Sequence, residues 1–477
     1  MQESVHPLDA IFRPRSIAVV GVSSSAPTTP GMTGYGFLTA IRRQGFTGPI
    51  YPVNPKMTEV AGLRCYPSVR DIPEEVDHVI SSVPAPAVPG LVDDAIARGV
   101  RSIHFYTAGF SETGDAERTD MERAAIAKLK AAGIRVIGPN CMGLYVPSVG
   151  LTFGLDMPRQ SGDVAFVSQS GANAGDFVRL AAARGVRFSK VVSYGNAADL
   201  NECDFYEYAA ADPQTRAVFG YLEGVRDGRR FVRVLRAAAR RKPVVILKGG
   251  RTASGARAAA SHTGSLAGSL AVFDALCRQA GALRVESMDE LVDLAVAFQY
   301  LTPPAGRGVA VIGAGGGTSV LAADALDSFG LDVPPMPAAI QEEMRRYVPI
   351  AGSSIRNPLD LSFGISEQHF VTTVRLAAAP DDIHMLLYHT HLDFAGPGGP
   401  SARGRETIQG LLAARTVVSK PIAVAVRTPI DGRSGEYTAE FIEACRREGI
   451  GVFLGLQDAA RALAALVRWR ELRQDRE

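Results

Sequence analysis

The chain has 477 residues, of which 46% are hydrophobic and 21% charged, and its formal net charge at pH 7 is +2. At roughly 150 residues per domain, this length predicts about three globular domains. The balanced charge argues against a protein that binds nucleic acid through its overall field, and no apolar run is long enough to span a membrane. The scattered cysteines never form a CxxC pair and predict no structural zinc or other metal site, and the absence of an apolar signal core predicts a cytoplasmic protein.

Short apolar strands alternate with amphipathic helices along the chain, which is typical of parallel sheets covered by helices. We therefore predict an α/β fold with three consecutive parallel-sheet domains, over residues 1–150, 151–304 and 305–477. Strands of the first domain are expected at Ile17–Val22, Ile50–Val53, His78–Val83, Ser102–Tyr106 and Arg135–Ile137, with helices at Val88–Arg98 and Ala116–Ala132. Strands of the second are expected at Asp163–Val167, Phe188–Ser193, Val218–Leu222 and Pro243–Leu247. After a linker, Leu301–Gly308, strands of the third are expected at Val309–Gly313, Ile383–His389, Ile422–Val426 and Gly451–Leu454.

Ligands of parallel α/β sheets bind beyond the carboxyl ends of the strands. The first predicted strand runs into GVSSSAPTTPGMTGYG (Gly21–Gly36), a loop of small residues that lacks the GxGxxG spacing of dinucleotide-binding folds. Two further strand ends, Val83–Pro86 and Thr107–Phe110, are also small and open. One such segment alone is most simply a strand-to-helix turn, whereas three at one edge favour an extended ligand that carries phosphate.

Two more predicted strands run directly into helices that open on small residues. They are followed by Ser168–Ala172 and by Ala314–Thr318. The N–H groups at such a helix start favour an anion by about 0.3–1 kcal/mol, and by about 2 kcal/mol when partly buried. A tight packing turn explains either segment alone, whereas two of them in a chain with an isolated loop histidine favour a shared phosphate.

A stretch of small residues, GGRTASGARAAASHTGSLAG, occupies Gly249–Gly268, and only four of its twenty residues carry larger side chains. A segment with so few hydrophobic anchors is expected to be a loop, and loops of about twenty residues are uncommon unless functional or disordered. Few charges or prolines interrupt it, which argues against disorder. We interpret it as a loop that presents one imidazole, His262, as a nucleophile on a thin backbone.

Together these segments resemble the nucleoside-diphosphate-forming acyl-CoA synthetases, the superfamily of succinyl-CoA synthetase. The resemblance covers nearly the whole chain in the family's order, and SHTGSLAGS and SQSGA are its most specific segments. The other matching segments are SIAVVGVS, PGMTGYGFL, GPIYPVNPK, SSVPAPAVPGLVDDA, TAGFSE, GPNCMG, SYGNAADLNECDFYEY, YLEGVRDGRRF, VAVIGAGGGTSVLAADAL and RNPLDL. The resemblance implies a Rossmann-like CoA-binding domain followed by two flavodoxin-like (succinyl-CoA-ligase-like) domains, the first of which carries a transiently phosphorylated histidine.

Carried over residue by residue, the resemblance implies that His262 is the phosphorylated histidine and that Glu223 steadies its imidazole. A neutral imidazole, with an unperturbed pKa of about 6.5, is nucleophilic near neutral pH, and a carboxylate on one ring nitrogen leaves the other free to attack. Without the resemblance, Glu223 would be interpreted as a surface charge at a strand end. Phosphate is expected on Ser168, Gln169, Ser170, Gly171, Ala172, Gly315, Gly316 and Gly317.

The same resemblance places coenzyme A on the first domain. Its expected contacts are Gly21, Ser23, Ser24, Gly34, Asn54, Lys56, Val83, Pro84, Thr107, Ala108, Gly109 and Asn140. Backbone amides and helix ends are expected to carry most of the anion binding, because the chain is nearly neutral overall. An ordinary solvated lysine remains the alternative interpretation of Lys56.

The reaction that the resemblance implies interconverts acyl-CoA, phosphate and a nucleoside diphosphate with carboxylic acid, CoA and a nucleoside triphosphate. Acyl phosphate forms first, and the histidine then carries its phosphoryl group to the nucleotide. No ATP-grasp domain is recognised, so we expect an α-type subunit that needs a separate ATP-grasp β subunit, in an α2β2-like hetero-oligomer. ATP and ADP (or GTP and GDP) with Mg²⁺ would be bound mainly by that partner. The sequence does not specify the acyl group.

Two other classes remain open at this point. One is a CoA-binding protein or acyl/CoA transferase of the same fold without synthetase activity. The other is a nicotinamide-binding Rossmann protein, against which the missing GxGxxG and the missing ribose-binding acid count.

Some residues depart from the family pattern or invite other interpretations. Ala197 stands where many members have a lysine, and Tyr194 replaces a small residue or valine. His389 and His391, with Asp393 nearby, are interpreted as strand-end or surface histidines rather than metal ligands. Cys141 is interpreted as a small turn residue near the CoA site rather than a nucleophile.

Overall fold

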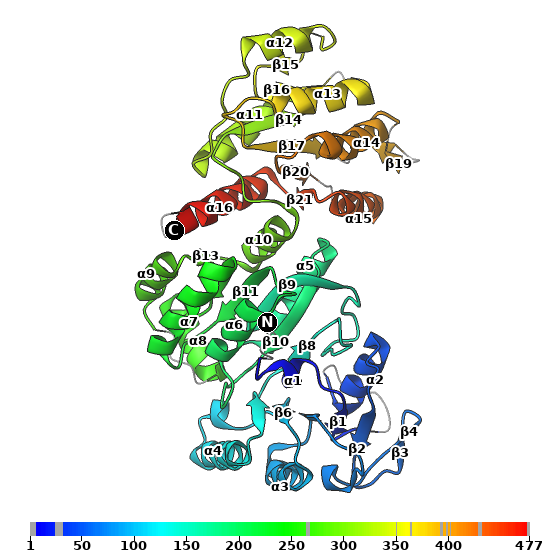
Figure 1. The fold of residues 1–477 in the computed structure, drawn as a ribbon, viewed down its shortest axis with the longest axis vertical. Helices are drawn as coiled ribbons and strands as arrows, with labels where there is room; N and C mark the ends of the chain where they lie inside the picture. Colours follow the sequence, from blue (N-terminus) through cyan, green and yellow to red (C-terminus); the bar gives the residue numbers. More distant parts are fainter. Residues whose placement is uncertain are drawn as a thin grey trace, which may run out of the picture. The chain divides into compact units, whose positions relative to one another are not determined.

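The computed structural model describes residues 6–23, 32–263, 268–349, 351–362, 365–391, 395–396, 399–400, 402–427 and 432–474 (Figure 1). The chain divides into two compact units. The first unit comprises Met1–Leu180 and Arg187–Glu286, and the second comprises Ala181–Val186 and Ser287–Glu477. Among the described helices, none combines the length and the hydropathy that crossing a membrane requires.

The first sheet has five parallel strands in the order β2-β1-β5-β6-β7. Its strands are β1 (Ile17–Val20), β2 (Ile50–Val53), β5 (His78–Ser81), β6 (Ser102–Phe105) and β7 (Arg135–Ile137). The helices of this domain are α2 (Gly34–Gln44), α3 (Val88–Arg98) and α4 (Ala116–Ala131), with the short turns η1 (Val69–Asp71), η2 (Ala85–Ala87) and η3 (Ser111–Thr113) and a hairpin of β3 (Glu59–Val60) and β4 (Leu63–Arg64). The short helix α1 (Asp9–Phe12) precedes β1, and its Phe12 ring stacks on Tyr208. All residues of β1 and β5 are buried, as expected for central strands covered on both faces.

The second sheet has six strands in the order β13-β12-β11-β9-β10-β8. They are β8 (Gly143–Tyr145), β9 (Ser161–Ser168), β10 (Phe188–Ser193), β11 (Ala217–Leu222), β12 (Val244–Lys248) and β13 (Leu283–Val285). The associated helices are α5 (Gly171–Ala183), α6 (Glu202–Ala211), α7 (Gly228–Arg241), α8 (Ala253–Thr263) and α9 (Leu270–Ala280). The sheet is parallel except for β8, which pairs antiparallel with β10 and follows the last strand of the first sheet directly in sequence.

The sheet of the second unit has the order β15-β16-β14-β17-β20-β21 and is parallel except at β15. Its strands are β14 (Val309–Gly313), β15 (Ser354–Ile355), β16 (Leu359–Asp360), β17 (Met385–His391), β20 (Ile422–Arg427) and β21 (Gly451–Phe453), and a separate pair is formed by β18 (Ala395–Gly396) and β19 (Gly399–Pro400). The helices are α10 (Met288–Tyr300), α11 (Gly316–Ser328), α12 (Ala338–Arg345), α13 (Glu367–Ala377), α14 (Ala402–Val417), α15 (Gly432–Arg447) and α16 (Leu456–Gln474). The predicted α/β fold with three parallel-dominated sheets is confirmed.

One local prediction is wrong. The segment expected to be an extended loop contains the helix α8, which runs over Ala253–Thr263. Alanine has the highest intrinsic helix propensity, and the run of alanines around Arg257 outweighs the lack of large side chains. The hydroxyl of Thr252 also accepts a hydrogen bond from the N–H of Gly255 at 3.1 Å, which satisfies a free donor of the first turn.

Candidate active site

A cavity of about 470 Å³ lies where the strand ends of the first two sheets meet. Its walls come from four separate turns, which follow β5, β6, β7 and β9. The lining residues are Ser82, Val83, Pro84, Tyr106, Thr107, Ala108, Asn140, Cys141, Met142, Gln169, Ser170, Gly171 and Ala172. Nine predicted residues are thus brought together in one cavity: five expected to bind CoA (Val83, Pro84, Thr107, Ala108, Asn140) and four expected to bind phosphate (Gln169, Ser170, Gly171, Ala172).

The turn after β6 is hydrogen-bonded to the turns after β5 and β7. The hydroxyl of Thr107 donates to the carbonyl of Val83 at 2.8 Å, and the carbonyl of Thr107 accepts from the N–H of Asn140 at 2.9 Å. Asn140 has a φ of +57°, in the left-handed region that asparagine tolerates better than most residues. Gly109, with a φ of +98°, completes the turn after β6.

The first loop approaches the cavity through its glycines. Gly21 has a φ of +87°, and a Cβ there would lie 3.0 Å from the backbone of Ser82. A Cβ on Gly34 would lie 2.6 Å from the carbonyl oxygen of Gly21. The sequence therefore needs glycine at both positions for the start of α2 to pack against the end of β1 and, through Ser82, against the cavity wall.

The other described residues predicted to contact CoA do not line the cavity; they are Gly21, Ser23, Gly34, Asn54, Lys56 and Gly109. The Asn54 amide donates to the carbonyl of Val22 at 2.6 Å, and its side-chain oxygen accepts from the N–H of Lys56 at 2.8 Å. The Lys56 side chain is exposed, as Ser23 is. Ser24 lies outside the described residues.

The turn between β9 and α5 is fixed from within. The Ser168 hydroxyl donates to the carbonyl of Ser170 at 2.7 Å, and the Ser170 hydroxyl accepts from the N–H of Asn173 at 3.3 Å. A Cβ on Gly171 would lie 2.7 Å from Cγ of Met142, so glycine lets α5 begin against the turn that follows β7. The start of α5 therefore lines the cavity, and a helix start is where free N–H groups can bind an anion.

Glu223 lies just beyond β11 and is only 4% exposed, so the alternative interpretation, a surface charge at a strand end, is wrong. The side-chain oxygen of Gln169 accepts from the N–H groups of Glu223 and Gly224 at 2.8 and 3.1 Å. The Tyr221 hydroxyl donates to the Glu223 carboxylate at 3.1 Å. These contacts fix a buried carboxylate beside Gln169, one of the cavity residues.

Lys248, at the end of β12, supports the same strand ends. Its ammonium donates to the carbonyl of Glu223 at 2.7 Å and also to the carbonyl of Gly249, where the histidine segment begins. Burial lowers the pKa of the Lys248 ammonium, an effect that the Glu223 charge opposes. The two carbonyls are thereby tied to one cation.

The backbone of His262 lies in the last turn of α8, and Gly264, Ser265, Leu266 and Ala267 lie outside the described residues. Helix α8 lies against η3, the turn that follows the predicted CoA segment Thr107–Phe110. The structure thus brings the histidine helix beside the first domain.

Sequence reasoning missed a buried polar residue beside the cavity, Asn196. It is 2% exposed, and its amide donates to the Glu112 carboxylate at 2.7 Å and to the Glu122 carboxylate at 3.2 Å. Its N–H donates to the carbonyl of Pro139 at 3.0 Å. The sequence signal for this residue is the SYGN segment, one of those that resemble the family.

Two residues with alternative interpretations are buried. Burial raises the pKa of the Cys141 thiol, and its Sγ lies 3.7 Å from the carbonyl oxygen of Phe105, so the thiol is held as a protonated turn residue. His389 is 1% exposed with a ring nitrogen 3.0 Å from the hydroxyl of Ser319, so it is a buried strand-end histidine rather than a surface one. The side chain of His391 and Asp393 lie outside what is described. Within the described part of the chain, no group of His, Cys, Asp and Glu is placed to hold a metal ion.

The second helix start, Gly315–Gly317, lies in the second unit after β14. The N–H of Gly315 donates to the Asp360 carboxylate at 3.0 Å and to the Ser362 hydroxyl at 2.8 Å. That N–H is therefore already engaged, and Gly316 and Gly317, which open α11, are exposed.

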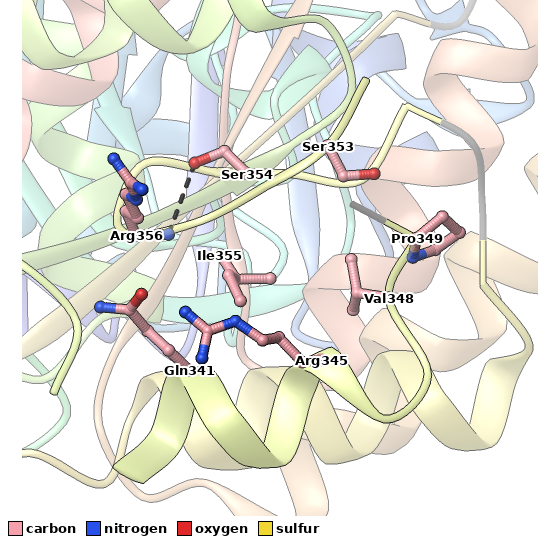
Figure 2. A pocket seen from close by; sticks show the side chains of 8 residues that line it. All are labelled: Gln341, Arg345, Val348, Pro349, Ser353, Ser354, Ile355 and Arg356. Carbon is pink, nitrogen blue, oxygen red and sulfur yellow. Dashed lines mark hydrogen bonds between the residues drawn. The ribbon is translucent and has the colours of Figure 1, made fainter. Parts of the chain in front are cut away.

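The second unit also contains a cavity of about 420 Å³ between α12 and β15 (Figure 2). Figure 2 shows Gln341 and Arg345 on the helix facing the strand segment that carries Ser354, Ile355 and Arg356. No residue expected to bind phosphate or CoA lines it.

Comparison with protein families gives three matches in chain order. Residues 15–147 match a CoA binding domain, 161–298 match a succinyl-CoA ligase like flavodoxin domain, and 309–444 match a Ligase-CoA domain. Together with the cavity that joins the first two domains, these matches define an acyl-CoA ligase of the succinyl-CoA-ligase-like class.

Individual relatives make the family explicit. The acetate–CoA ligase (ADP-forming) II subunit alpha of Pyrococcus furiosus is 35% identical, with 97% of each chain covered. The acetate–CoA ligase (ADP-forming) I of Archaeoglobus fulgidus is 36% identical over 98% of this chain, which spans 64% of that longer protein. A solved acetyl-coenzyme A synthetase 1 of Ca. Korarchaeum cryptofilum, in complex with phosphate and ADP, has a TM-score of 0.84 at 31% identity and covers 98% of this chain and 97% of its own. The chain belongs to the family of ADP-forming acyl-CoA synthetases.

Proposed function

We propose that this chain is the α-type subunit of an ADP-forming acyl-CoA synthetase, with CoA bound by residues 1–150, the phosphohistidine carried by residues 151–304, and the third domain formed by residues 305–477. One observation carries the proposal: a single cavity is lined both by the turns expected to bind CoA and by the helix start expected to bind phosphate. The thioester carbon and the attacking phosphate would then meet without either ligand leaving its site. Placing two reactants in this way removes much of the entropic barrier of a bimolecular step.

The reaction would proceed in three balanced steps. Phosphate attacks the thioester carbonyl, the C–S bond breaks, and acyl phosphate and CoA form. A ring nitrogen of His262 then attacks the phosphorus, the P–O bond to the acyl group breaks, and the carboxylate leaves. Finally ADP accepts the phosphoryl group from His262, and the histidine returns to its neutral state.

The described residues support the first two steps. The start of α5 lines the cavity, and its N–H groups would bind the phosphate oxygens. The Glu223 carboxylate is buried and oriented by Tyr221, and it would hold a ring N–H of His262 so that the other nitrogen attacks. The third step needs the nucleotide, which with Mg²⁺ would be bound mainly by an ATP-grasp β subunit in an α2β2-like assembly. Relatives named as alpha subunits support such a partner.

Cysteine placement supports a reducing, cytoplasmic location. Each of the five cysteines is buried and free. Buried free thiols persist where glutathione and thioredoxin keep them reduced.

The test is phosphorylation of the full chain with an ADP-forming β subunit and ³²P-labelled ATP. We expect an acid-labile, base-stable phosphate on the parent chain and none on His262→Ala. His369→Ala, which removes an exposed histidine of the second unit, is the matched control and should be labelled like the parent. Labelling of His262→Ala at the parent's level would refute the assignment. CoA binding without any labelling would favour a CoA-binding protein or acyl/CoA transferase.

A further inference from the structure

The Asn196 amide joins segments that are far apart in sequence. Its Nδ2 donates to the carboxylates of Glu112 and Glu122, at 2.7 and 3.2 Å, and lies 3.3 Å from the Ser111 hydroxyl. Its Oδ1 lies 3.4 Å from the amide nitrogen of Asn140, a residue of the cavity wall. One side chain of the second domain is therefore bonded to two turns of the first.

The backbone of Asn196 makes further contacts. Its N–H donates to the carbonyl of Pro139 at 3.0 Å, and its carbonyl accepts from the Arg226 guanidinium. Arg226 lies three positions after Glu223, and its N–H donates to the buried Glu202 carboxylate at 3.2 Å. Through Arg226, the backbone of Asn196 is hydrogen-bonded to the loop that follows Glu223.

Glu112 connects Asn196 to the turn after β6. Its other carboxylate oxygen accepts from the N–H groups of Gly109, at 2.5 Å, and Phe110, at 3.1 Å. Burial raises the pKa of Glu112, but the hydrogen bonds from Asn196, Gly109 and Phe110 outweigh it and lower the pKa below its usual value. The carboxylate is therefore charged at neutral pH and bonded at both of its oxygens.

We propose that Asn196 and Glu112 are positioning residues that hold the CoA turn Thr107–Phe110 against the second domain. Glu112 belongs to η3, which follows the CoA turn directly and against which the histidine helix α8 lies. The inference rests on the proposed function, because it assigns the pair a role in presenting CoA to the phosphoryl-transfer groups.

A charge exchange separates this role from ordinary packing. Asn196→Asp replaces an amide donor with a third carboxylate beside Glu112 and Glu122, and like charges at hydrogen-bond distance repel. Glu112→Gln removes one negative charge and supplies an amide donor, so the double variant restores a donor–acceptor pair between positions 112 and 196, while the repulsion between position 196 and Glu122 remains. In Glu112→Gln alone, the new amide has two orientations. In one, its NH₂ group faces the NH₂ group of Asn196; in the other, it faces the backbone N–H groups of Gly109 and Phe110. Either orientation sets two donors against each other.

The measurement uses the full chain and calorimetric titration with CoA, with thermal unfolding alongside. We expect each single variant to weaken CoA binding by about tenfold, the size expected for loss of one charge-assisted hydrogen bond. The double variant should recover at least half of that loss on a logarithmic scale. Glu117→Gln, an exposed carboxylate in the first turn of α4, is the matched control and should bind CoA like the parent.

The outcomes are distinct. A parent chain that does not bind CoA overturns the proposed function and this inference with it. A parent that binds CoA, with single variants that bind it equally well, overturns the positioning role alone. Weakened binding that the double variant does not restore assigns the effect to general destabilisation and also overturns the role. If Asn196→Asp fails to fold, Glu112→Gln decides, because its side chain is only partly buried.

Discussion

Replacing Glu223 with glutamine should slow phosphorylation of His262 and leave CoA binding intact. The change is nearly isosteric, and the amide oxygen still accepts from the Tyr221 hydroxyl, 3.1 Å away in the parent. The bonds from Glu223 and Gly224 to Gln169 come from the backbone and are unaffected. Only the negative charge is lost, at a position that is 4% exposed.

The size of the effect follows from that burial. A unit charge 4 Å from a developing imidazolium is worth about 4 kcal/mol at an effective dielectric constant of 20. At 1.36 kcal/mol per tenfold change, this corresponds to a rate loss of about a thousandfold. That value lies within the range of about 10²–10⁴ that positioned acid–base partners commonly contribute.

The assay is rapid-quench labelling of the chain in a single turnover with a β subunit and ³²P-ATP. Calorimetry with CoA provides the second readout, and Glu117→Gln serves as the exposed-carboxylate control. A labelling rate for Glu223→Gln within threefold of the parent would refute the role of this carboxylate. Loss of CoA affinity in the same variant would show instead that the cavity had been disturbed.

Two further perturbations follow from the structure. Gly171→Ala should weaken the binding of inorganic phosphate, measured by equilibrium titration. The added Cβ would lie 2.7 Å from Cγ of Met142 and force the start of α5 away from the cavity. Unchanged phosphate binding would argue against this helix start as the anion site. Burial lowers the pKa of Lys242 to about 8. The unfolded chain, with a lysine pKa of about 10.4, therefore holds more protons between these values, so this residue makes stability rise with pH across that window. Urea unfolding should show a smaller rise from about pH 8 to about pH 10 in Lys242→Met than in the parent, and an equal rise would contradict the assigned shift.

The sequence was sufficient where local composition decides the structure. Strand β14 occurs at the predicted Val309–Gly313, because an uninterrupted apolar run between turn residues has few alternatives in an α/β fold. Helix α3 also matches its prediction, since Pro89 in its first turn and Gly99 after its end mark both limits. Small side chains predict a loop at helix α8, but the high helix propensity of its alanines decides the structure there.

The site was less accessible, because burial and long-range bonding leave no periodic signal. From its neighbours in sequence, Glu223 is indistinguishable from an ordinary charge at a strand end. Only the resemblance to the family predicts its role beside His262. The bond between Asn196 and Glu112 joins positions 84 residues apart, and neither residue type marks such a pair. Such contacts form only in the folded chain, where the strand ends lie at one edge, so the local sequence does not predict them.

The antiparallel strand β8 has a consequence for how this protein can be divided. It precedes the linker to β9, yet it pairs with β10 in the second sheet. Farther along, the carbonyl of Pro158 accepts from the Gln44 amide of α2 at 2.9 Å, so the linker returns to the first domain after the strand has left it. A fragment that ends near Gly150 would expose an edge strand without its neighbour, and a fragment that begins there would lack the edge of its sheet. Each of the first two domains is therefore completed by a segment next to the other in sequence. A chimera between relatives should fold when both domains are taken from the same parent.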